Sequence, residues 1–338
     1  MKAAITDGKG NVWIDEVPIP EPEPYQCLCR TLACATCTGT DIKIMYGKLP
    51  WKENYPAILG HESIGRVIKK GEKVRYVKEG MMILRPTAVY PGGKLGNYYS
   101  IWGGFSEYGL VMDTRAFLED HPGEDTGYGK FQMEVPSDIE PADAIMLITL
   151  KETAGYVMDM GITLNDSVVV LGAGPVAMSM VLFSKLRGAF PVIAVARRDG
   201  PLENIKKFGA NYIINNTKED MVKKVLEITE GKGAKYIIDT AGDEELFQNA
   251  FRMLAEDGRI SPYAVFPEDA FKKVDGTKIL QAKTGEVPAH NYLLDLVRLG
   301  KVSLKDFYSH KMPFSEIAKG FEMIKNKEAF KIVFEMGG

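Results

Sequence analysis

A glycine-rich turn between an apolar run and a helical pattern constrains the fold of this chain most. Residues 168–171 are apolar, Gly172 and Gly174 follow, and Pro175 and Val176 begin a stretch with helical periodicity. This arrangement is typical of a dinucleotide-binding βαβ unit, because the glycines let the backbone turn sharply and approach the pyrophosphate at a helix amino terminus. The alternative is a glycine turn without a ligand. We predict a dinucleotide site here.

The end of the next expected strand bears on the choice of dinucleotide. An acidic side chain about 20 residues after the glycines would bind the ribose hydroxyls of NAD. The strand expected at 192–195 ends instead in Ala196, Arg197 and Arg198. Arginine at this position can accommodate a 2′-phosphate, so NADP is favoured over NAD. In the alternative reading the arginines are solvated and Asp199 binds the ribose.

The pattern of expected elements changes from about Ala142. Before it, the chain has short strand-like runs at 26–33, 62–68 and 104–111. After it, strands and helices alternate, which predicts a parallel, doubly wound sheet. The expected strands are 167–171, 192–196, 236–240 and 259–265, and the expected helices are 176–186, 203–208 and 244–255. Helices at 293–299 and 314–324 and a strand at 331–334 follow. We predict a catalytic domain of 1–145 with 286–338, and a dinucleotide-binding domain of 146–285.

The bulk composition limits the possible partners. A chain of 338 residues suggests two domains. Its 42 basic and 45 acidic residues are spread along the chain and give a net charge of −3, which does not favour nucleic acid. No apolar run reaches the roughly 18 residues needed to cross a bilayer, and the first six residues resemble a strand rather than a signal peptide. We expect a cytoplasmic protein without a membrane partner.

The four cysteines lie close together, at Cys27, Cys29, Cys34 and Cys37. No disulfide could therefore join distant parts of the chain, which favours a reducing compartment. One interpretation is a four-cysteine zinc or iron–sulfur site. The other is that Cys27 and Cys29 share one face of a strand at 26–33 as small apolar residues.

Three further segments have a recognisable order and spacing. They are CTGTD at 37–41, GHESIGRV at 60–67 and GGFSEY at 103–108. Together they resemble the zinc-dependent branch of the medium-chain dehydrogenase/reductase superfamily, which includes alcohol, sorbitol, threonine and glucose dehydrogenases. The resemblance covers nearly the whole chain, including the glycine turn and a tail with His310 and Lys331. It implies a Rossmann domain and a mostly β GroES-like catalytic domain.

The resemblance also implies a catalytic centre. Cys37 and His61 would be zinc ligands, and Glu62 a carboxylate that can approach the metal. Asp41 would fix the imidazole of His61, and Thr40 would begin a proton relay. A catalytic zinc needs an open position, where it acts as a Lewis acid on an alcohol oxygen while a hydride passes to the nicotinamide. Since no cysteine follows Cys37, we expect one catalytic zinc and no structural zinc.

Two departures from the family pattern affect the ligand set. Thr38 is inserted after Cys37, so alignment from the downstream side would put Thr38 at the ligand position; we prefer Cys37 because thiolate is the better zinc ligand. The register of relatives puts Ile148 at the third ligand. Glu152 lies one helical turn later and is our candidate ligand. Alternatively, Glu152 and Lys151 form an exposed or interfacial pair.

Aromatic residues near these segments could line a substrate pocket or serve as packing. They are Tyr46, Trp51, Tyr98, Tyr99 and Trp102.

The resulting hypothesis is a zinc-dependent dehydrogenase that transfers a hydride between NADP, or NAD, and an alcohol, polyol or sugar. The family habit suggests a homodimer or homotetramer. Two alternatives remain: a zinc-free quinone or enone reductase of the same superfamily, and a non-catalytic NADP-binding sensor.

Overall fold

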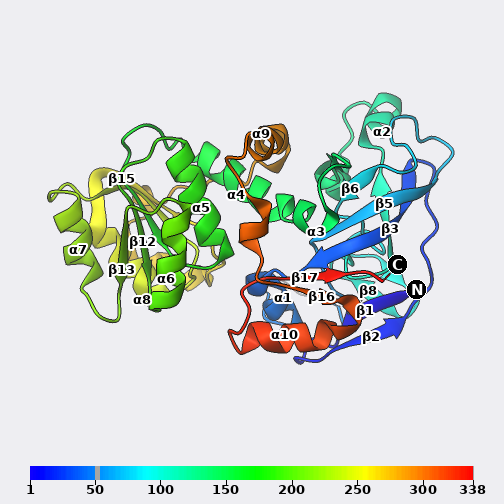
Figure 1. Ribbon diagram of the computed structural model, residues 1–338, viewed down its shortest axis with the longest axis horizontal. Helices are drawn as coiled ribbons and strands as arrows, with labels where there is room; N and C mark the ends of the chain where they lie inside the picture. Colours follow the sequence, from blue (N-terminus) through cyan, green and yellow to red (C-terminus); the bar gives the residue numbers. More distant parts are fainter. Residues whose placement is uncertain (50–53, 338) are drawn as a thin grey trace. The chain divides into compact units, whose positions relative to one another are not determined.

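The computed structural model describes residues 1–49 and 54–337, and the chain falls into two compact units (Figure 1). The first unit is Met1–Ile148 with Ser303–Gly338, and the second is Thr149–Val302. Trp51, a candidate pocket residue, lies outside the described residues.

The first unit contains two sheets. One has the order β2-β1-β4-β8-β7, and the other has the order β10-β6-β5-β3-β17-β16 with β9 also paired to β3. The strands are β1 (Lys2–Thr6), β2 (Val12–Glu16), β3 (Gln26–Ala35), β4 (Ala57–Ile58), β5 (Ser63–Lys70), β6 (Met82–Leu84), β7 (Lys94–Leu95), β8 (Tyr98–Ser100), β9 (Tyr108–Met112), β10 (Glu134–Val135), β16 (His310–Pro313) and β17 (Ile332–Glu335). The helices are α1 (Thr38–Met45), α2 (Thr114–Asp120), α3 (Pro141–Ala144) and α10 (Ile317–Lys325).

Strand β3 is the centre of the second sheet. Its first half pairs with β9, its last three residues pair with β17, and β5 runs along its other edge. Cys27 and Cys29 of β3 lie in a buried apolar cluster with Val67 and Val111. Burial raises the pKa of the Cys27 thiol to about 12, which suits a neutral packing residue. The interpretation of these two cysteines as apolar fillers is confirmed.

The second unit is built on a parallel sheet with the order β13-β12-β11-β14-β15. This 3-2-1-4-5 order is that of a doubly wound dinucleotide-binding fold, so the predicted fold class is confirmed. The strands are β11 (Val168–Leu171), β12 (Val192–Ala196), β13 (Tyr212–Asn215), β14 (Ala234–Asp239) and β15 (Leu254–Pro262). The helices are α4 (Leu147–Asp159), α5 (Pro175–Leu186), α6 (Asp199–Ile205), α7 (Met221–Ile228), α8 (Glu244–Ala250) and α9 (Glu286–Arg298).

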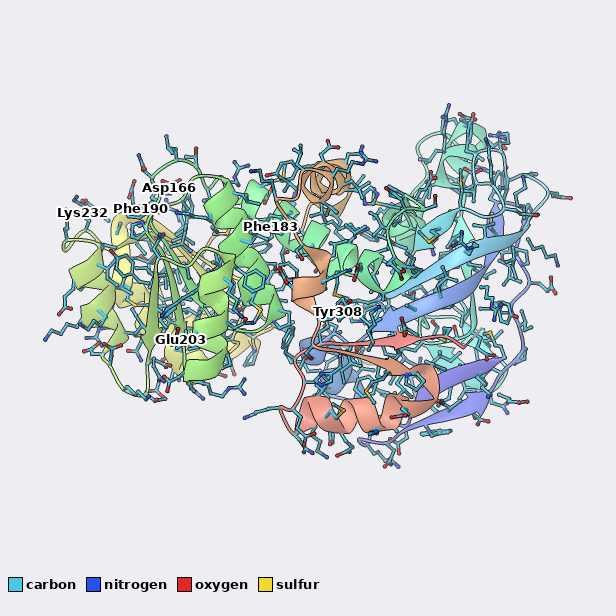
Figure 2. All side chains as sticks on the ribbon, in the orientation of Figure 1. Asp166, Phe183, Phe190, Glu203, Lys232 and Tyr308 are labelled. Carbon is cyan, nitrogen blue, oxygen red and sulfur yellow. The ribbon has the colours of Figure 1, made fainter. Side chains whose placement is uncertain are left out.

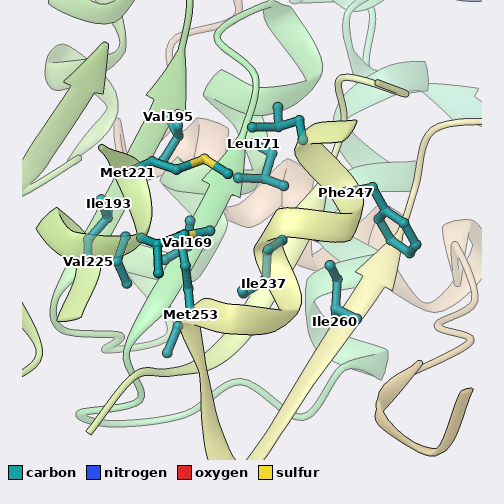
Figure 3. Packing of buried hydrophobic residues seen from close by; sticks show 14 of the residues in the cluster. Val169, Leu171, Ile193, Val195, Met221, Val225, Ile237, Phe247, Met253 and Ile260 are labelled. Carbon is teal, nitrogen blue, oxygen red and sulfur yellow. The ribbon is translucent and has the colours of Figure 1, made fainter. Parts of the chain in front are cut away.

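Alternate residues of the parallel strands build the core on one face of this sheet. Val169, Val195 and Ile237 pack with Val225 of α7 and Phe247 of α8 (Figure 3). Helix α5, with its buried Phe183 (Figure 2), packs against β11 and β12. Strands with apolar residues on both faces are expected in a parallel sheet covered on both sides.

In the structure, the boundary between the two units differs from the predicted one. Residues 286–302, assigned from the sequence to the catalytic domain, belong to the second unit. Glu286 at the start of α9 lies 3.5 Å from the buried Lys151 of α4, and Gly155 of α4 leaves no room for a Cβ beside Thr284. These contacts tie α9 to α4.

Some predicted elements differ in extent. The helix expected at 244–255 ends at Ala250, and β15 begins at Leu254. The strand expected at 104–111 begins only at Tyr108. Strand β13 and helix α7 were not predicted, although Asp220 caps α7 by accepting from the Val222 and Lys223 N–H groups. No helix within the described residues is both long and apolar enough to span a membrane.

Candidate active site

Cys37 lies at the junction between β3 and α1, where an aspartate fixes the backbone. The Cys37 N–H donates to Asp41 Oδ2 at 2.7 Å, and the Asp41 N–H donates to the Cys37 carbonyl at 2.9 Å. Asp41 is fully buried, whereas Cys37 is partly exposed. The helix start therefore holds the Cys37 thiol in place and keeps it accessible.

His61 and Glu62 lie in the bend between β4 and β5. Gly60, with φ of +98°, precedes them, and a Cβ on Gly60 would collide with the Phe105 ring. The Gly104 N–H also donates to the Gly60 carbonyl at 2.7 Å. The GGF segment therefore packs directly on the GHE segment, which gives a physical reason for the two motifs to occur together.

Three potential metal ligands come together here. One ligand atom each from Cys37, His61 and Glu62 lies within 4.8 Å of the others. His61 Nδ1 lies 3.4 Å from Asp41 Oδ1, so Nε2 is the ring nitrogen left for another partner. His61 Nδ1 and Asp41 Oδ1 are both buried, and neither has a hydrogen bond among the described residues. A thiol, an imidazole and a carboxylate form a donor set that fits zinc.

The surroundings of the His61 ring favour a positive charge. Burial opposes charge on the imidazole, but Cys37 and Asp41 outweigh it and raise the pKa of His61. The same two groups would stabilise a bound cation at this place.

Glu62 forms a buried ion pair with Lys331 of the first unit. Lys331 Nζ lies 2.5 Å from Glu62 Oε2, and the two side chains are 5% and 2% exposed. The sequence had placed Lys331 only in the family-like tail and gave it no role. The two residues are 269 positions apart, and only the strand order brings them together.

Thr38 and Thr40 use their hydroxyl groups differently. Thr40 Oγ1 lies 3.7 Å from Cys37 Sγ, beside the three candidate ligands. The inserted Thr38 is exposed and donates to the Phe330 carbonyl at 2.9 Å. Its hydroxyl therefore already has a backbone partner, which favours Cys37 over Thr38 as the ligand.

Of the described candidate pocket aromatics, Trp102 lies beside the ligand cluster. Its ring centroid is 5.2 Å from that of His61, and its φ is +62°, which is unusual for a bulky residue. Tyr98 instead donates to Asp15. The other two contact lysines: Lys94 lies over the Tyr99 ring and Lys48 over the Tyr46 ring.

Glu152 and Ile148 both lie on α4. Ile148 is buried, and Glu152 is half-buried in the second unit. Of the alternative, an exposed or interfacial Lys151–Glu152 pair, the exposed form is wrong, because Lys151 is fully buried and faces Glu286. The role of Glu152 as a ligand stays a prediction.

The glycine turn of the second unit has the form that a phosphate-binding turn needs. Gly172 has φ of +123°, and a Cβ there would collide with Thr240 Oγ1. Gly174 precedes α5 with open space around it, and Pro175 begins the helix. Val176 follows in the first turn, so the N–H groups at this helix start can face an anionic ligand.

Two arginines, Arg197 and Arg198, follow β12. Both are exposed and Ala196 is half-buried. Arg197 pairs with Asp243, which also caps α8 by accepting from the Leu246 N–H at 2.9 Å. Asp243 was not predicted, since nothing in the local sequence links it to a residue 46 positions earlier.

Arg197 and Asp243 line a pocket of about 340 Å³, together with Asn216 and Arg252. Asp199, the alternative ribose ligand, accepts from Asn215 at 2.7 Å and pairs with Lys218 at 2.6 Å. Lys218 and Asn215 lower the pKa of Asp199, so it is ionised at neutral pH.

Two family models match the chain. The alcohol dehydrogenase GroES-like domain matches residues 23–119, and the zinc-binding dehydrogenase model matches residues 175–285. L-threonine 3-dehydrogenase of Pyrococcus horikoshii is 29% identical over 94% of this chain and 93% of its own length. NADP-dependent isopropanol dehydrogenase of Entamoeba histolytica is 27% identical over 97% and 93%. The structure of benzyl alcohol dehydrogenase from Acinetobacter calcoaceticus superposes with a TM-score of 0.81, at 22% identity and 99% coverage of both chains.

These matches and the two-unit fold identify the class of protein: an oxidoreductase of the alcohol-dehydrogenase type. The chain belongs to the zinc-dependent medium-chain dehydrogenase/reductase superfamily, as its motifs predicted.

Proposed function

We propose that the chain is a zinc-dependent dehydrogenase that uses NADP in preference to NAD and acts on the CH–OH group of an alcohol, polyol or sugar. The observation that carries this proposal is the cluster of Cys37, His61 and Glu62 within 4.8 Å. A zinc-free reductase would have no use for a thiol, an imidazole and a carboxylate gathered in this way. One catalytic zinc per chain is proposed, because Cys37 is the last cysteine.

In the proposed mechanism, Cys37 and His61 would hold the metal. A bound zinc would supply Lewis-acid polarisation of a substrate oxygen, and the bound nicotinamide would supply hydride chemistry. Asp41 orients the His61 imidazole through Nδ1 and compensates positive charge. The Thr40 hydroxyl lies beside Cys37 Sγ and would carry a proton away from the substrate hydroxyl. Trp102 would exclude water from the same place.

For the cofactor, we propose that the turn at Gly172 and Gly174 holds the pyrophosphate, with Pro175 and Val176 presenting the helix start. Arg197 and Arg198 would bind the 2′-phosphate. The exposure of both arginines and the lack of an acidic residue at Ala196 support NADP. Asp199 is engaged by Asn215 and Lys218, which further disfavours its use for the ribose.

The test is a screen of alcohols, polyols, sugars and their carbonyl partners with NADP and NAD. Turnover is monitored by the absorbance of the reduced nicotinamide. Zinc-dependent turnover of at least one CH–OH compound is the expected result. Turnover of quinones or enones in zinc-free protein would favour the reductase, and cofactor binding without any turnover or metal would favour the sensor.

Glu152 is proposed as a further zinc ligand, and a homodimer or homotetramer as the assembly. A cytoplasmic location remains a prediction as well. Light scattering tests the assembly, since a monomer at working concentration would contradict it.

A further inference from the structure

Arg197, which is proposed to bind the 2′-phosphate, is paired with a carboxylate in the structure. Arg197 Nη2 donates to Asp243 Oδ2, and the two side chains are 61% and 31% exposed. Asp243 Oδ1 accepts from the Leu246 N–H at 2.9 Å, which fixes the carboxylate at the start of α8. The Leu246 N–H and Arg197 lower the pKa of Asp243, so its carboxylate is ionised at neutral pH. A fixed anion therefore holds the guanidinium.

The pocket lined by this ion pair has more acidic than basic side chains. Its lining includes four carboxylates and two guanidinium groups, which belong to Glu219, Asp220, Asp243, Glu245, Arg197 and Arg252. Like charges repel one another, so a lining of this kind opposes the approach of a further anion. A phosphate at Arg197 therefore meets a carboxylate that already binds the guanidinium, and three more carboxylates that line the same pocket.

We propose that Asp243 is a specificity-determining residue that competes with the 2′-phosphate for Arg197 and so limits the preference for NADP over NAD. This inference rests on the proposed use of NADP. A guanidinium whose charge is compensated by a fixed carboxylate attracts a second anion less strongly. The 2′-hydroxyl of NAD has no charge, so the same carboxylate costs NAD binding little.

The exposure of the ion pair sets the size of the expected effect. Exposed ion pairs are weak, because water screens the charges and two long side chains must be ordered. The 2′-phosphate can therefore displace the Asp243 carboxylate from Arg197, at a moderate cost in affinity. Removal of the Asp243 charge should strengthen binding of a 2′-phosphate by about threefold to tenfold.

The experiment measures how tightly the full chain binds two adenosine fragments, by isothermal titration calorimetry. Adenosine 2′,5′-bisphosphate has the 2′-phosphate, adenosine 5′-monophosphate lacks it, and neither carries the nicotinamide. Asp243→Asn should bind the bisphosphate about threefold to tenfold more tightly than the wild type and the monophosphate equally well. Asparagine caps helices as well as aspartate does, so the start of α8 is kept.

Asp220→Asn is the matched control. Asp220 lines the same pocket and also caps a helix, but its side chain accepts from the Val222 and Lys223 N–H groups at the start of α7. A general effect of negative charge in the pocket would strengthen bisphosphate binding in both variants. The proposal predicts that Asp220→Asn stays within about twofold of the wild type, because this carboxylate does not hold Arg197.

The double variant Arg197→Ala/Asp243→Asn tests the cause directly. Compared with Arg197→Ala alone, it should show no gain for the bisphosphate, because there is no guanidinium to release. Asp243→Ser also removes the charge and keeps a capping oxygen, so it serves if the asparagine variant does not fold.

Four results would overturn the inference: no gain for the bisphosphate in the Asp243 variants, an equal gain for the monophosphate, an equal gain in Asp220→Asn, or a gain that persists without Arg197. A wild-type chain that binds both fragments equally would instead contradict the proposed preference for NADP, and this result is separate from the effect of Asp243→Asn.

Discussion

The two halves of the proposed catalytic apparatus are built in opposite ways. In the first unit, the candidate metal ligands are held by buried partners: Asp41 faces His61, and Lys331 pairs with Glu62. In the second unit, the proposed phosphate readers Arg197 and Arg198 are exposed, and Arg197 pairs with Asp243 at the surface. Buried charged groups need a charged partner within the folded chain, whereas exposed cations can exchange water or a surface carboxylate for a ligand. The first half is therefore preorganised, and the second is adaptable.

The largest expected effect separates the two halves. Cys37→Ala and His61→Ala should each lower turnover by at least about a thousandfold, because several kcal/mol of Lewis-acid stabilisation is lost. NADP affinity, measured by fluorescence titration, should stay nearly unchanged, since the proposed phosphate contacts lie in the other unit. Cys34→Ala is the control, because this fully buried cysteine is outside the ligand cluster. Loss of cofactor binding in either ligand variant would contradict the assignment of the metal ligands and the cofactor contacts to different units.

Glu152 is the one candidate zinc ligand that belongs to the second unit, whereas Cys37, His61 and Glu62 belong to the first. If it is a ligand, Glu152→Gln should weaken zinc binding by more than about a hundredfold, since even the partners behind metal ligands contribute about 10- to 100-fold. Competition with a chelator measures this affinity. Asp159→Asn, an exposed carboxylate on the same helix α4, is the control. Unchanged zinc affinity in Glu152→Gln would confine the metal site to the first unit.

The adaptable half is tested by cofactor choice. Replacement of Arg197 and Arg198 by alanine should weaken NADP binding about ten- to hundredfold and leave NAD almost unaffected, because each charge-assisted contact to the 2′-phosphate is lost. Dissociation constants for both cofactors measure the difference. Lys232→Ala, which removes an exposed cation of the second unit that pairs with Glu230, is the control. Equal weakening of NADP and NAD would show that the arginines do not recognise the phosphate.

The smallest expected effect concerns a buried carboxylate in the second unit. Asp239 Oδ1 accepts from the Ala241 and Gly242 N–H groups, while buried Oδ2 has no hydrogen bond within the described residues. Burial raises the pKa of Asp239 from 3.8 to about 6. The folded-state pKa is raised above the unfolded value, so the protonated carboxyl is favoured in the folded chain. The free energy of unfolding is therefore highest below about pH 4 and falls as the pH rises from about 4 through about 6.

Asp239→Asn keeps the Oδ1 acceptor and removes the charge. It should raise the free energy of unfolding by about 1–3 kcal/mol at pH 8, with a gain in Tm of about 2–4 °C per kcal/mol. The gain should shrink as the pH falls from 6 towards 4. Thermal unfolding over this range measures it, and a pH-independent difference would show that the carboxylate charge is not the cause.

The same contrast explains what could be predicted from the sequence. The glycine turn is predictable, because a tight turn requires particular residues at fixed local spacing. Asp41 was assigned through the resemblance of the CTGTD segment to the family. Lys331 and Asp243 could not be assigned roles, because their partners are 269 and 46 residues away. Periodicity indicates which face of an element is buried, but not which charged side chain on a distant strand meets it. Trp102 was one of several aromatic candidates, and its contact with His61 distinguishes it from Tyr98 and Tyr99.

The central claim is that Cys37, His61 and Glu62 form a single catalytic zinc site. The most direct test is metal analysis of the full chain, prepared with zinc and then dialysed, in parallel with Cys37→Ala. We predict about one zinc per wild-type chain and almost none in the variant. No zinc in the wild type, two per chain, or an undiminished content in Cys37→Ala would contradict the account.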